Sequence, residues 1–457
     1  MARAKKEASL TPEERLQAAL VPDWEWPHKL PENWCWTTVG AINQYVGISA
    51  DPTKAKNETF ELYSVPSSAG NYPEIVLGAD IGSTKQAVKK GDVLLCKINP
   101  RINRVWKVSK YTDHSLLASS EWIVVRNSRL ISNYLMWCFR SPYFRGYMLS
   151  NVSGVGGSLM RAQPKFVQGY PVPVPPLAEQ QRIVDRIESL FAKLDEAKEK
   201  AQAVVHSFET RKAAILHKAF TGELTAKWRE EHGVGMDSWR WIPLKKSGSW
   251  YGGGTPSMSR SEYWENGTLL WVTAKDMKSD LIEDTLMHTN MFGVENSSAN
   301  YIAQPAVLFV MRSGILRRTF PVCMVKKPFT VNQDIKALVP TDNIDLEYLF
   351  WGCKANEKRI LESCMKNGTT VESINSAALR DFEIPISGSN EQIEIVRILD
   401  AFFAKEQQAK EAAEKVLDQI ELMKKSILAR AFRGELGTND TSEESAVELL
   451  KEIIRRG

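Results

Sequence analysis

The chain has 457 residues, 43% of them hydrophobic and 25% charged, and its formal net charge at pH 7 is +4. These values are typical of an ordinary globular protein with two or three domains, and such a mild charge does not separate a nucleic-acid binder from a metabolic enzyme. Segment 1–29 has no apolar core of a signal peptide, and no apolar run is long enough to span a bilayer, so we expect a cytoplasmic protein with no membrane partner. The six cysteines form no C-x-x-C pair, so we expect no zinc knuckle and no disulfide framework.

The first globular domain is predicted over residues 30–175, where short β-like runs are broken by Gly, Pro and Asn. Within it, GDVLLCKINPRINRVWKVSK carries several basic and amide side chains between two strand-like runs. Arg and Lys reach phosphates and guanine edges, while Asn and Gln pair with adenine. The alternative is a solvated loop, since basic loops are often only that. The candidate DNA contacts here are Lys97, Asn99, Arg101, Asn103, Arg104 and Lys107.

A second loop of this domain, SGVGGSLMRAQPKF (Ser153 to Phe166), lies just ahead of a long helical pattern. Gly lets a backbone approach a phosphate closely, and hydroxyl and amide groups make sequence-independent contacts with it. We expect Ser158 and Arg161 to contact DNA; the alternative is a simple turn into the helix.

A long helix is predicted over residues 176–221, because apolar residues recur at alternating steps of four and three, as on the contact face of a coiled coil. Prolines at 171, 173, 175 and 176 exclude helix before it, and Gly222 supplies a stop after it. In isolation such a heptad run indicates a dimerisation stalk or an ordinary core helix. Residues 222–238 then form a linker.

The second globular domain is predicted over residues 239–387, and it too has a basic stretch, VLFVMRSGILRRTFPVCMVKK, followed by FTVNQDIKAL. A loop ahead of the next long helix, NGTTVESINSAALRDF, resembles the loop in the first domain. The run GGGTPS (Gly252 to Ser257) lacks the ending of a nucleotide-binding loop, so a turn is the favoured interpretation. The candidate DNA contacts here are Lys275, Arg312, Arg317, Arg318, Asn332, Gln333, Lys336, Thr369 and Thr370.

The second long helix, predicted over 388–433, repeats the first. ILARAFRGEL (Ile427 to Leu436) matches ILHKAFTGEL (Ile215 to Leu224) at seven of ten positions, 212 residues further on. The same offset aligns EQIEIV with EQQRIV, so the register holds without insertions. We therefore predict an α+β fold in which two mixed α/β domains are joined by two long helices that form an antiparallel coiled coil, as a pseudo-twofold tandem duplication. The tail, 434–457, is expected to pack with segment 1–29.

Catalytic motifs are missing from the sequence. It contains no G-x-x-x-x-G-K-[ST], no G-x-G-x-x-G and no H-E-x-x-H, and Asn99-Pro100-Arg101 lacks the second proline and the aromatic of an adenine methyltransferase motif. We therefore expect this chain to be no enzyme, and any linked reaction to occur on a partner.

These residues together resemble the specificity subunit of type I restriction-modification systems, over nearly the whole chain. The resemblance is carried by the P-P-L-x-E-Q entry to a long helix (Pro175 to Gln180), by the two A-F-x-G-E-L exits, and by GGTPS, EYW, WVTAKDM and NQDIKAL in the second domain. The second entry departs from the pattern, because it reads IPISGSNEQ (Ile384 to Gln392).

The resemblance implies a non-catalytic reader of double-stranded DNA. Each target-recognition domain would read one half of an asymmetric bipartite site, and the paired helices would set the gap. Two methyltransferase subunits and the restriction subunits, which translocate DNA, would dock on this scaffold, with S-adenosylmethionine, ATP and Mg²⁺ bound by those partners and no cofactor or metal by this chain. We hypothesise that apolar residues on the helices, Phe191 and Leu216 among them, belong to the methyltransferase docking surface.

The alternative function is a non-catalytic coiled-coil adaptor, whose two domains bind peptide or nucleic acid without sequence specificity. Competition by nonspecific DNA separates it from a sequence-specific reader. An autonomous nuclease or methyltransferase is disfavoured by the missing motifs.

Overall fold

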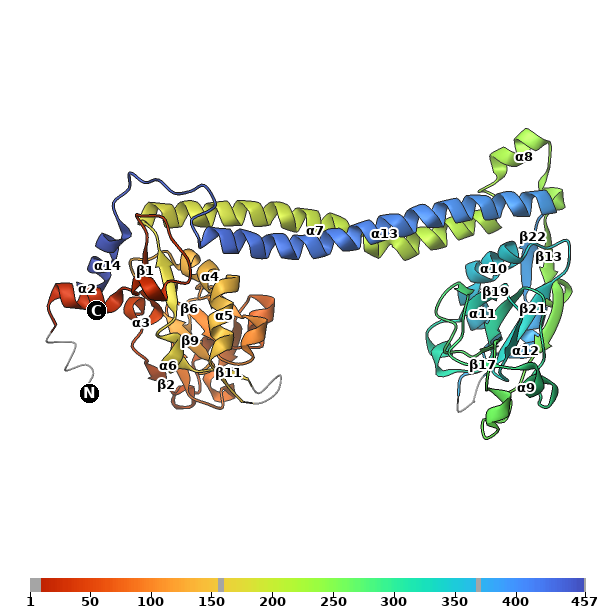
Figure 1. Cartoon of the computed structure of the whole chain (residues 1–457), viewed down its shortest axis with the longest axis horizontal. Helices are drawn as coiled ribbons and strands as arrows, with labels where there is room; N and C mark the ends of the chain where they lie inside the picture. The colour runs from red at the N-terminus through yellow and green to blue at the C-terminus, as the bar shows by residue number, and fades with distance from the viewer. Residues whose placement is uncertain (1–9, 155–159, 367–370, 456–457) are drawn as a thin grey trace. The chain divides into compact units, whose positions relative to one another are not determined.

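The computed structural model describes residues 10–154, 160–366 and 371–455. The chain divides into two compact units: unit 1 comprises 1–201 and 415–457, and unit 2 comprises 202–414 (Figure 1). Each unit contains one globular domain of mixed strands and helices together with part of each long helix. The predicted α+β class with two mixed domains and two long helices is confirmed.

In the described part of unit 1, the strands form a five-stranded sheet in the order β2-β5-β8-β3-β4 and a three-stranded sheet in the order β7-β6-β9. Only β3 and β8 run parallel in these sheets. Two antiparallel strand pairs, β1-β12 and β10-β11, complete the unit. The strands are β1 (Cys35–Thr38), β2 (Ser49–Ala50), β3 (Thr59–Tyr63), β4 (Glu74–Leu77), β5 (Lys85–Ala87), β6 (Val93–Cys96), β7 (Val105–Lys107), β8 (Ser115–Ala118), β9 (Trp122–Val125), β10 (Val152–Ser153), β11 (Arg161–Ala162) and β12 (Pro171–Val174).

The described N-terminal and C-terminal segments belong to unit 1 and pack together there, as expected. Ala19 and Leu450 lie in one buried cluster, and the Asn33 side-chain amide donates to the Asp440 carbonyl at 2.9 Å. The short helices of this unit are α2 (Pro12–Ala19), α3 (Val39–Ile42), α4 (Ser132–Arg140), α5 (Pro142–Ser150), α6 (Pro164–Val167) and α14 (Ala446–Arg455).

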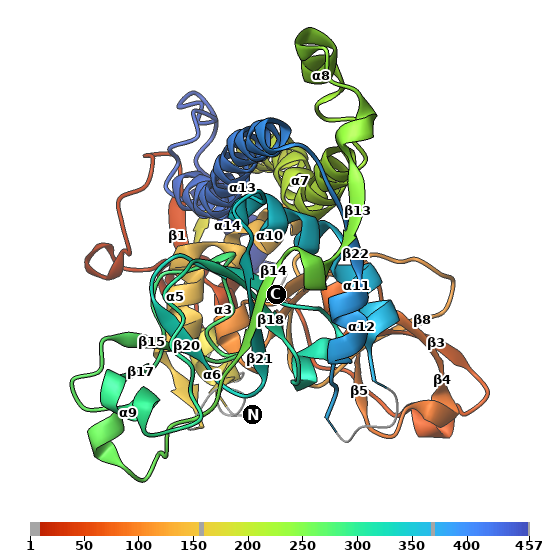
Figure 2. The same ribbon diagram turned by 90° about the vertical axis from the view of Figure 1, so that its right-hand side faces the viewer.

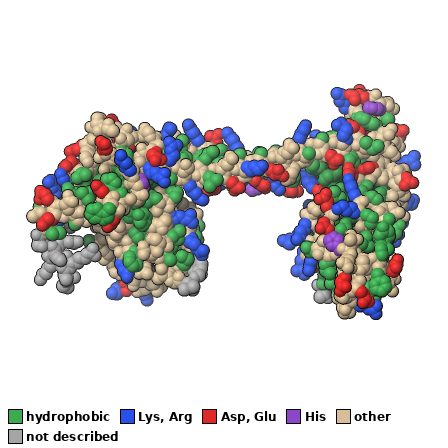
Figure 3. All heavy atoms as spheres, viewed as in Figure 1, with side chains coloured by type: hydrophobic (Ala, Val, Ile, Leu, Met, Phe, Trp, Pro, Cys, Tyr) green, Lys and Arg blue, Asp and Glu red, His purple; other side chains and the backbone are tan. Residues whose placement is uncertain are grey.

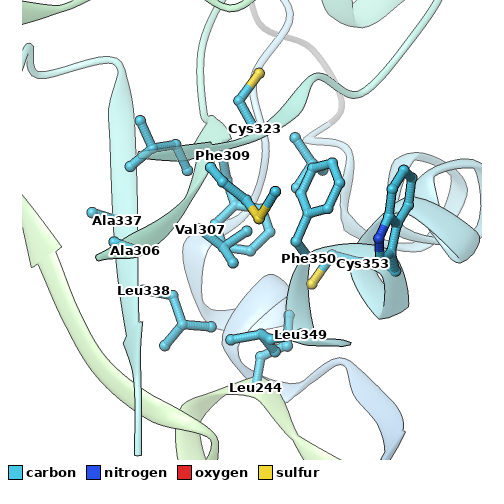
Figure 4. Close-up of a cluster of buried hydrophobic side chains, with 14 of the residues drawn as sticks. Leu244, Ala306, Val307, Phe309, Cys323, Ala337, Leu338, Leu349, Phe350 and Cys353 are labelled. Atoms are coloured by element: carbon cyan, nitrogen blue, oxygen red, sulfur yellow. The ribbon is translucent and has the colours of Figure 1, made fainter. Parts of the chain in front are cut away.

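Unit 2 is built around a five-stranded sheet in the order β14-β21-β18-β19-β16, with a three-stranded sheet β17-β15-β20 and the pair β13-β22 beside it. Helix α10 covers the large sheet, so that Leu349 and Phe350 pack with Val307 and Leu338 (Figure 4). The elements are α8 (Ala226–His232), β13 (Arg240–Pro243), β14 (Gly248–Gly252), β15 (Leu269–Val272), β16 (Leu281–Ile282), β17 (His288–Thr289), α9 (Met291–Glu295), β18 (Ala306–Val310), β19 (Val322–Val325), β20 (Phe329–Val331), β21 (Ile335–Pro340), α10 (Leu346–Ala355), α11 (Glu357–Cys364), α12 (Ser376–Asp381) and β22 (Glu383–Ile386).

The two long helices are α7 (Leu177–Phe220) and α13 (Ser389–Ala431), which run side by side (Figure 2). Gly222 and Gly434 lie just beyond them with φ of 81° and 75°, a conformation that favours glycine and ends a helix. The contacts run in opposite directions along the two helices: in unit 1, Lys198 pairs with Glu421 at 2.9 Å, and Asp195 pairs with Lys424. The predicted antiparallel coiled coil is confirmed.

The contact face of this coiled coil is not wholly apolar. In unit 2 the Arg211 guanidinium forms an ion pair with Glu406 at 2.6 Å, at a position where the heptad pattern predicts an apolar residue. Two small residues on this face are buried, Ala201 in unit 1 and Ala413 in unit 2, whereas Ala409 is exposed.

The Glu-Gln sequence at the start of each long helix forms the same junction in both units. In unit 1, buried Gln180 accepts from the Ile131 backbone N–H and donates to the Pro175 carbonyl; in unit 2, buried Gln392 accepts from Asp345 N–H and donates to the Ser387 carbonyl. The unusual sequence at the entry to the second long helix, IPISGSNEQ, therefore leaves these two hydrogen bonds of the glutamine unchanged.

The glutamates of these junctions are also buried, but the groups that bind them differ in charge. Glu179 accepts hydrogen bonds from the Trp34 indole and the Asn439 amide. Glu391 accepts from the Trp239 indole at 2.9 Å and forms an ion pair with Arg229 at 2.5 Å. The matching junctions support the tandem duplication, which stays an inference.

Candidate DNA-binding surface

Unit 1 brings its two candidate loops side by side. Basic loop 1 (residues 97–104) connects β6 to β7, and the described part of pre-helix loop 1 (residues 153–154 and 160–166) lies ahead of α7. Ile98 forms a β-bridge with Arg161, the Asn99 N–H donates to the Met160 carbonyl at 2.8 Å, and the Ala162 N–H donates to the Lys97 carbonyl at 2.9 Å. Residues far apart in sequence therefore form one surface.

The shape of basic loop 1 depends on two asparagines. Asn99 and Asn103 adopt left-handed backbone conformations, with φ of 46° and 52°, which asparagine tolerates better than most residues. They flank the short 3₁₀ turn Pro100–Ile102, so Arg101 stands at the exposed tip of the loop. The Asn103 amide donates to the Arg140 carbonyl at 3.2 Å, which leaves it only partly free for a base.

The other basic residues of this loop are less exposed than Arg101. Lys97 and Arg104 are half-buried, and Lys107 at the far end of β7 donates to the Asn133 side-chain oxygen on α4 at 2.5 Å. Arg101 is therefore the candidate contact in this loop with the freest side chain.

Unit 2 repeats the arrangement. Basic loop 2 (residues 311–321) connects β18 to β19, and it lies against the described part of pre-helix loop 2 (residues 371–382). Arg312 forms a β-bridge with Ser373, and the Ser313 N–H donates to the Glu372 carbonyl at 3.1 Å. Ser373 follows Arg161 of the bridge in unit 1 by the same 212 residues that separate the sequence repeats.

A second edge of unit 2 brings together four further candidates. Strands β15 and β20 run parallel with Val272 opposite Val331, so the residues after them lie next to each other. Lys275 is exposed after β15, and after β20 Gln333 accepts a hydrogen bond from the Thr255 hydroxyl at 2.8 Å. The Asn332 side-chain oxygen accepts from the Asp334 N–H, and Lys336 lies opposite Gly252 in the β14-β21 ladder.

The GGGTPS run packs tightly against this edge. A Cβ added at Gly253 would meet the Val331 carbonyl oxygen at 1.8 Å, so no other residue fits there. The need for glycine at this position therefore comes from backbone packing, which agrees with the interpretation of the run as a turn.

Three arginines of the candidate loops, one in unit 1 and two in unit 2, form ion pairs with carboxylates that sequence reasoning missed. Arg161 pairs with Glu121 at 2.6 Å, Arg312 pairs with Asp334 at 2.8 Å, and Arg317 pairs with Glu372. The hydrogen bond from Arg317 holds the pKa of the Glu372 carboxyl below its usual range. Figure 3 shows acidic side chains interspersed with Lys and Arg on the surfaces of both units.

Four candidates remain to be placed. Ser158, Thr369 and Thr370 lie outside the described residues. Arg318 is exposed and borders a groove of about 480 Å³ whose lining includes Lys212 and Lys354.

The two candidate docking residues differ in accessibility. Phe191 is partly buried, with its ring edge-to-face on Trp137 and the Lys424 ammonium over it. Leu216 is only 4% exposed, because it belongs to the hydrophobic core of unit 2. Leu216 therefore presents little open side chain for docking, because its position on the helix faces the recognition domain of its own chain.

Among the described residues, no group of three or more His, Cys, Asp and Glu side chains is placed to hold a metal ion. In the same part of the chain, no helix is both long and apolar enough to cross a membrane.

Part of the chain is similar to DNA-specificity proteins. Residues 251–417 match the family model of the type I restriction modification DNA specificity domain. The Escherichia coli EcoR124I/EcoR124II specificity subunit is 40% identical over 35% of this chain, and the match spans 40% of that relative's length. The EcoDI specificity subunit of Escherichia coli is 22% identical over 93% of this chain and 95% of its own length.

The fold is also shared with a solved structure. One such chain comes from a study of the structural basis underlying complex assembly and conformational transition of the type I R-M system. It superposes with a TM-score of 0.72 at 22% identity, over 90% of this chain and 100% of that chain. At this identity the likeness establishes the fold.

Proposed function

We propose, from the premise that this chain belongs to the specificity subunits of type I restriction-modification systems, that it binds duplex DNA at a defined sequence. The observation that carries the proposal is the pairing, in each unit, of a basic loop with a pre-helix loop through a β-bridge. Such a pair offers arginines for base edges and phosphates, and backbone groups for the phosphates.

The target is a bipartite, asymmetric site. Unit 1 reads one half through basic loop 1, and unit 2 reads the other through basic loop 2 and the ends of β15 and β20. The sequences of these loops differ, NPRINR against SGILRR, so the half-sites differ as well. The coiled coil of α7 and α13 sets the unspecified gap between them.

No catalytic step is assigned to this chain. Two methyltransferase subunits dock on it and methylate adenines with S-adenosylmethionine, and restriction subunits use ATP and Mg²⁺ to translocate and cleave unmodified DNA. Those cofactors belong to the partners. Phe191 stays in the proposed docking surface, whereas buried Leu216 does not.

The proposal is tested by expressing the chain with its neighbouring methyltransferase subunit in a host that lacks adenine methylation, and sequencing the genome for modified adenines. We expect methylation at one split motif, present only when both proteins are made. A stable complex that methylates no defined motif would instead favour the adaptor. Methylation by this chain alone would refute the non-catalytic assignment.

A further inference from the structure

The arginines of basic loop 2 are bound by acids in a particular geometry. Arg312 donates to Asp334, and Arg317 to Glu372, through the Nε–H group in both cases. The carboxylates are the more shielded partners: the Asp334 and Glu372 side chains are 23% and 19% exposed, against 58% and 69% for Arg312 and Arg317. Each acid therefore lies behind its arginine and presents the guanidinium to solvent.

This geometry leaves the two terminal nitrogens of each guanidinium free of the carboxylate. Those nitrogens form the fork that donates two hydrogen bonds to O6 and N7 of guanine. A carboxylate behind the fork also cancels most of the charge that would attract a phosphate, because phosphate binding depends on net positive charge. Glu372 remains ionised at neutral pH, since its pKa lies below the usual range.

We propose that Asp334 and Glu372 are specificity-determining positioning residues, which hold Arg312 and Arg317 with their forks toward guanine edges and disfavour binding to phosphates of unrelated DNA. The inference rests on the proposed function, and it adds that the half-site read by unit 2 contains guanine. It also explains why acids occur within a surface that must attract DNA: they lower nonspecific affinity and so raise discrimination.

The test uses the full chain in complex with its methyltransferase subunits. Binding of E372Q and D334N is measured on two duplexes at several salt concentrations. One duplex carries the motif identified by methylation sequencing, and the other is the same duplex with the unit 2 half-site scrambled. The matched control is E347Q. Glu347 pairs with Lys326 at the opposite end of β19 from basic loop 2, and its side chain is 27% exposed.

For E372Q and D334N we expect affinity for the scrambled duplex to rise about threefold, as an exposed ion pair is lost and the arginine turns to a phosphate. The salt dependence on that duplex should steepen by about one unit. Discrimination between the duplexes should fall about tenfold, the scale of one bidentate base contact. E347Q should leave all three quantities unchanged, and E372Q should not lower discrimination further in an R317A background.

Unchanged discrimination in both E372Q and D334N would overturn the inference, as would a loss of affinity for both duplexes in equal proportion, which indicates a merely structural role. These outcomes leave the proposed function intact. If the unaltered complex itself fails to discriminate between the duplexes, the proposed function fails and the inference with it.

Discussion

At the scale of single residues, the structure depends on buried charges with specific partners. Glu391 is buried at the start of α13, and Arg229 on α8 binds it while also donating to the Gly222 carbonyl at 2.6 Å. One arginine thus neutralises the acid at the start of one long helix and binds the chain just after the end of the other. The counterpart, Glu179, is satisfied by neutral donors, including Trp34 at 2.7 Å.

Replacing Arg229 should therefore weaken unit 2. We expect R229M to lower the free energy of unfolding by about 3–5 kcal/mol, because an unpaired carboxylate stays buried. Urea unfolding monitored by tryptophan fluorescence measures this change. K200M, which breaks the exposed pair of Lys200 with Glu196, is the control and should not shift the transition; an equal shift in both variants would contradict this account.

The residue scale is also where sequence reasoning reached least far. The basic residues were found because Arg and Lys cluster locally around Pro100 and Gly314. Their acidic partners were missed, because Glu121 and Glu372 lie 40 and 55 residues from the arginines they bind. Only the folded chain brings them together. The burial of Leu216 was missed for a similar reason, since a heptad pattern does not show which further faces a domain covers.

At the scale of elements, the long helices could be predicted almost entirely. Their periodicity, the prolines before α7 and the glycines after both helices are local signals, and the structure places the helices accordingly. The two domains also contain short β-like runs, but the pairing of their strands has no local signal, because it joins distant segments such as β3 and β8. Within the helices, the Arg211–Glu406 ion pair is the exception to the apolar residues that the heptad pattern predicts.

This pair offers a prediction about the coiled coil. At the positions 212 residues away, the sequence has Leu194 and Met423, so the same site in the other repeat is apolar. We expect E406L alone to destabilise the protein, because Arg211 is left without its partner. The double variant R211M/E406L should be at least as stable as the unaltered chain, since apolar residues often replace a partly buried ion pair without loss. Thermal unfolding of the three proteins measures this; a double variant less stable than the unaltered chain would contradict it.

At the scale of the whole molecule, the proposed function gives the chain two readers on a shared frame. The internal repeat predicts this organisation, and the matching junctions and loop bridges of the two units support it. Which bases the proposed function reads could not be predicted, because the two pairs of loops differ in sequence while the helices repeat. The helices therefore carry the repeat signal, and in the proposed function the loops carry the difference in specificity.

The most direct test of two independent readers is to exchange residues 239–387 for the corresponding segment of the EcoDI relative and to map adenine methylation with the methyltransferase subunit present. We expect that one half of the motif changes, while the other half and the gap stay as they were. A change in both halves together, or in neither, would contradict it.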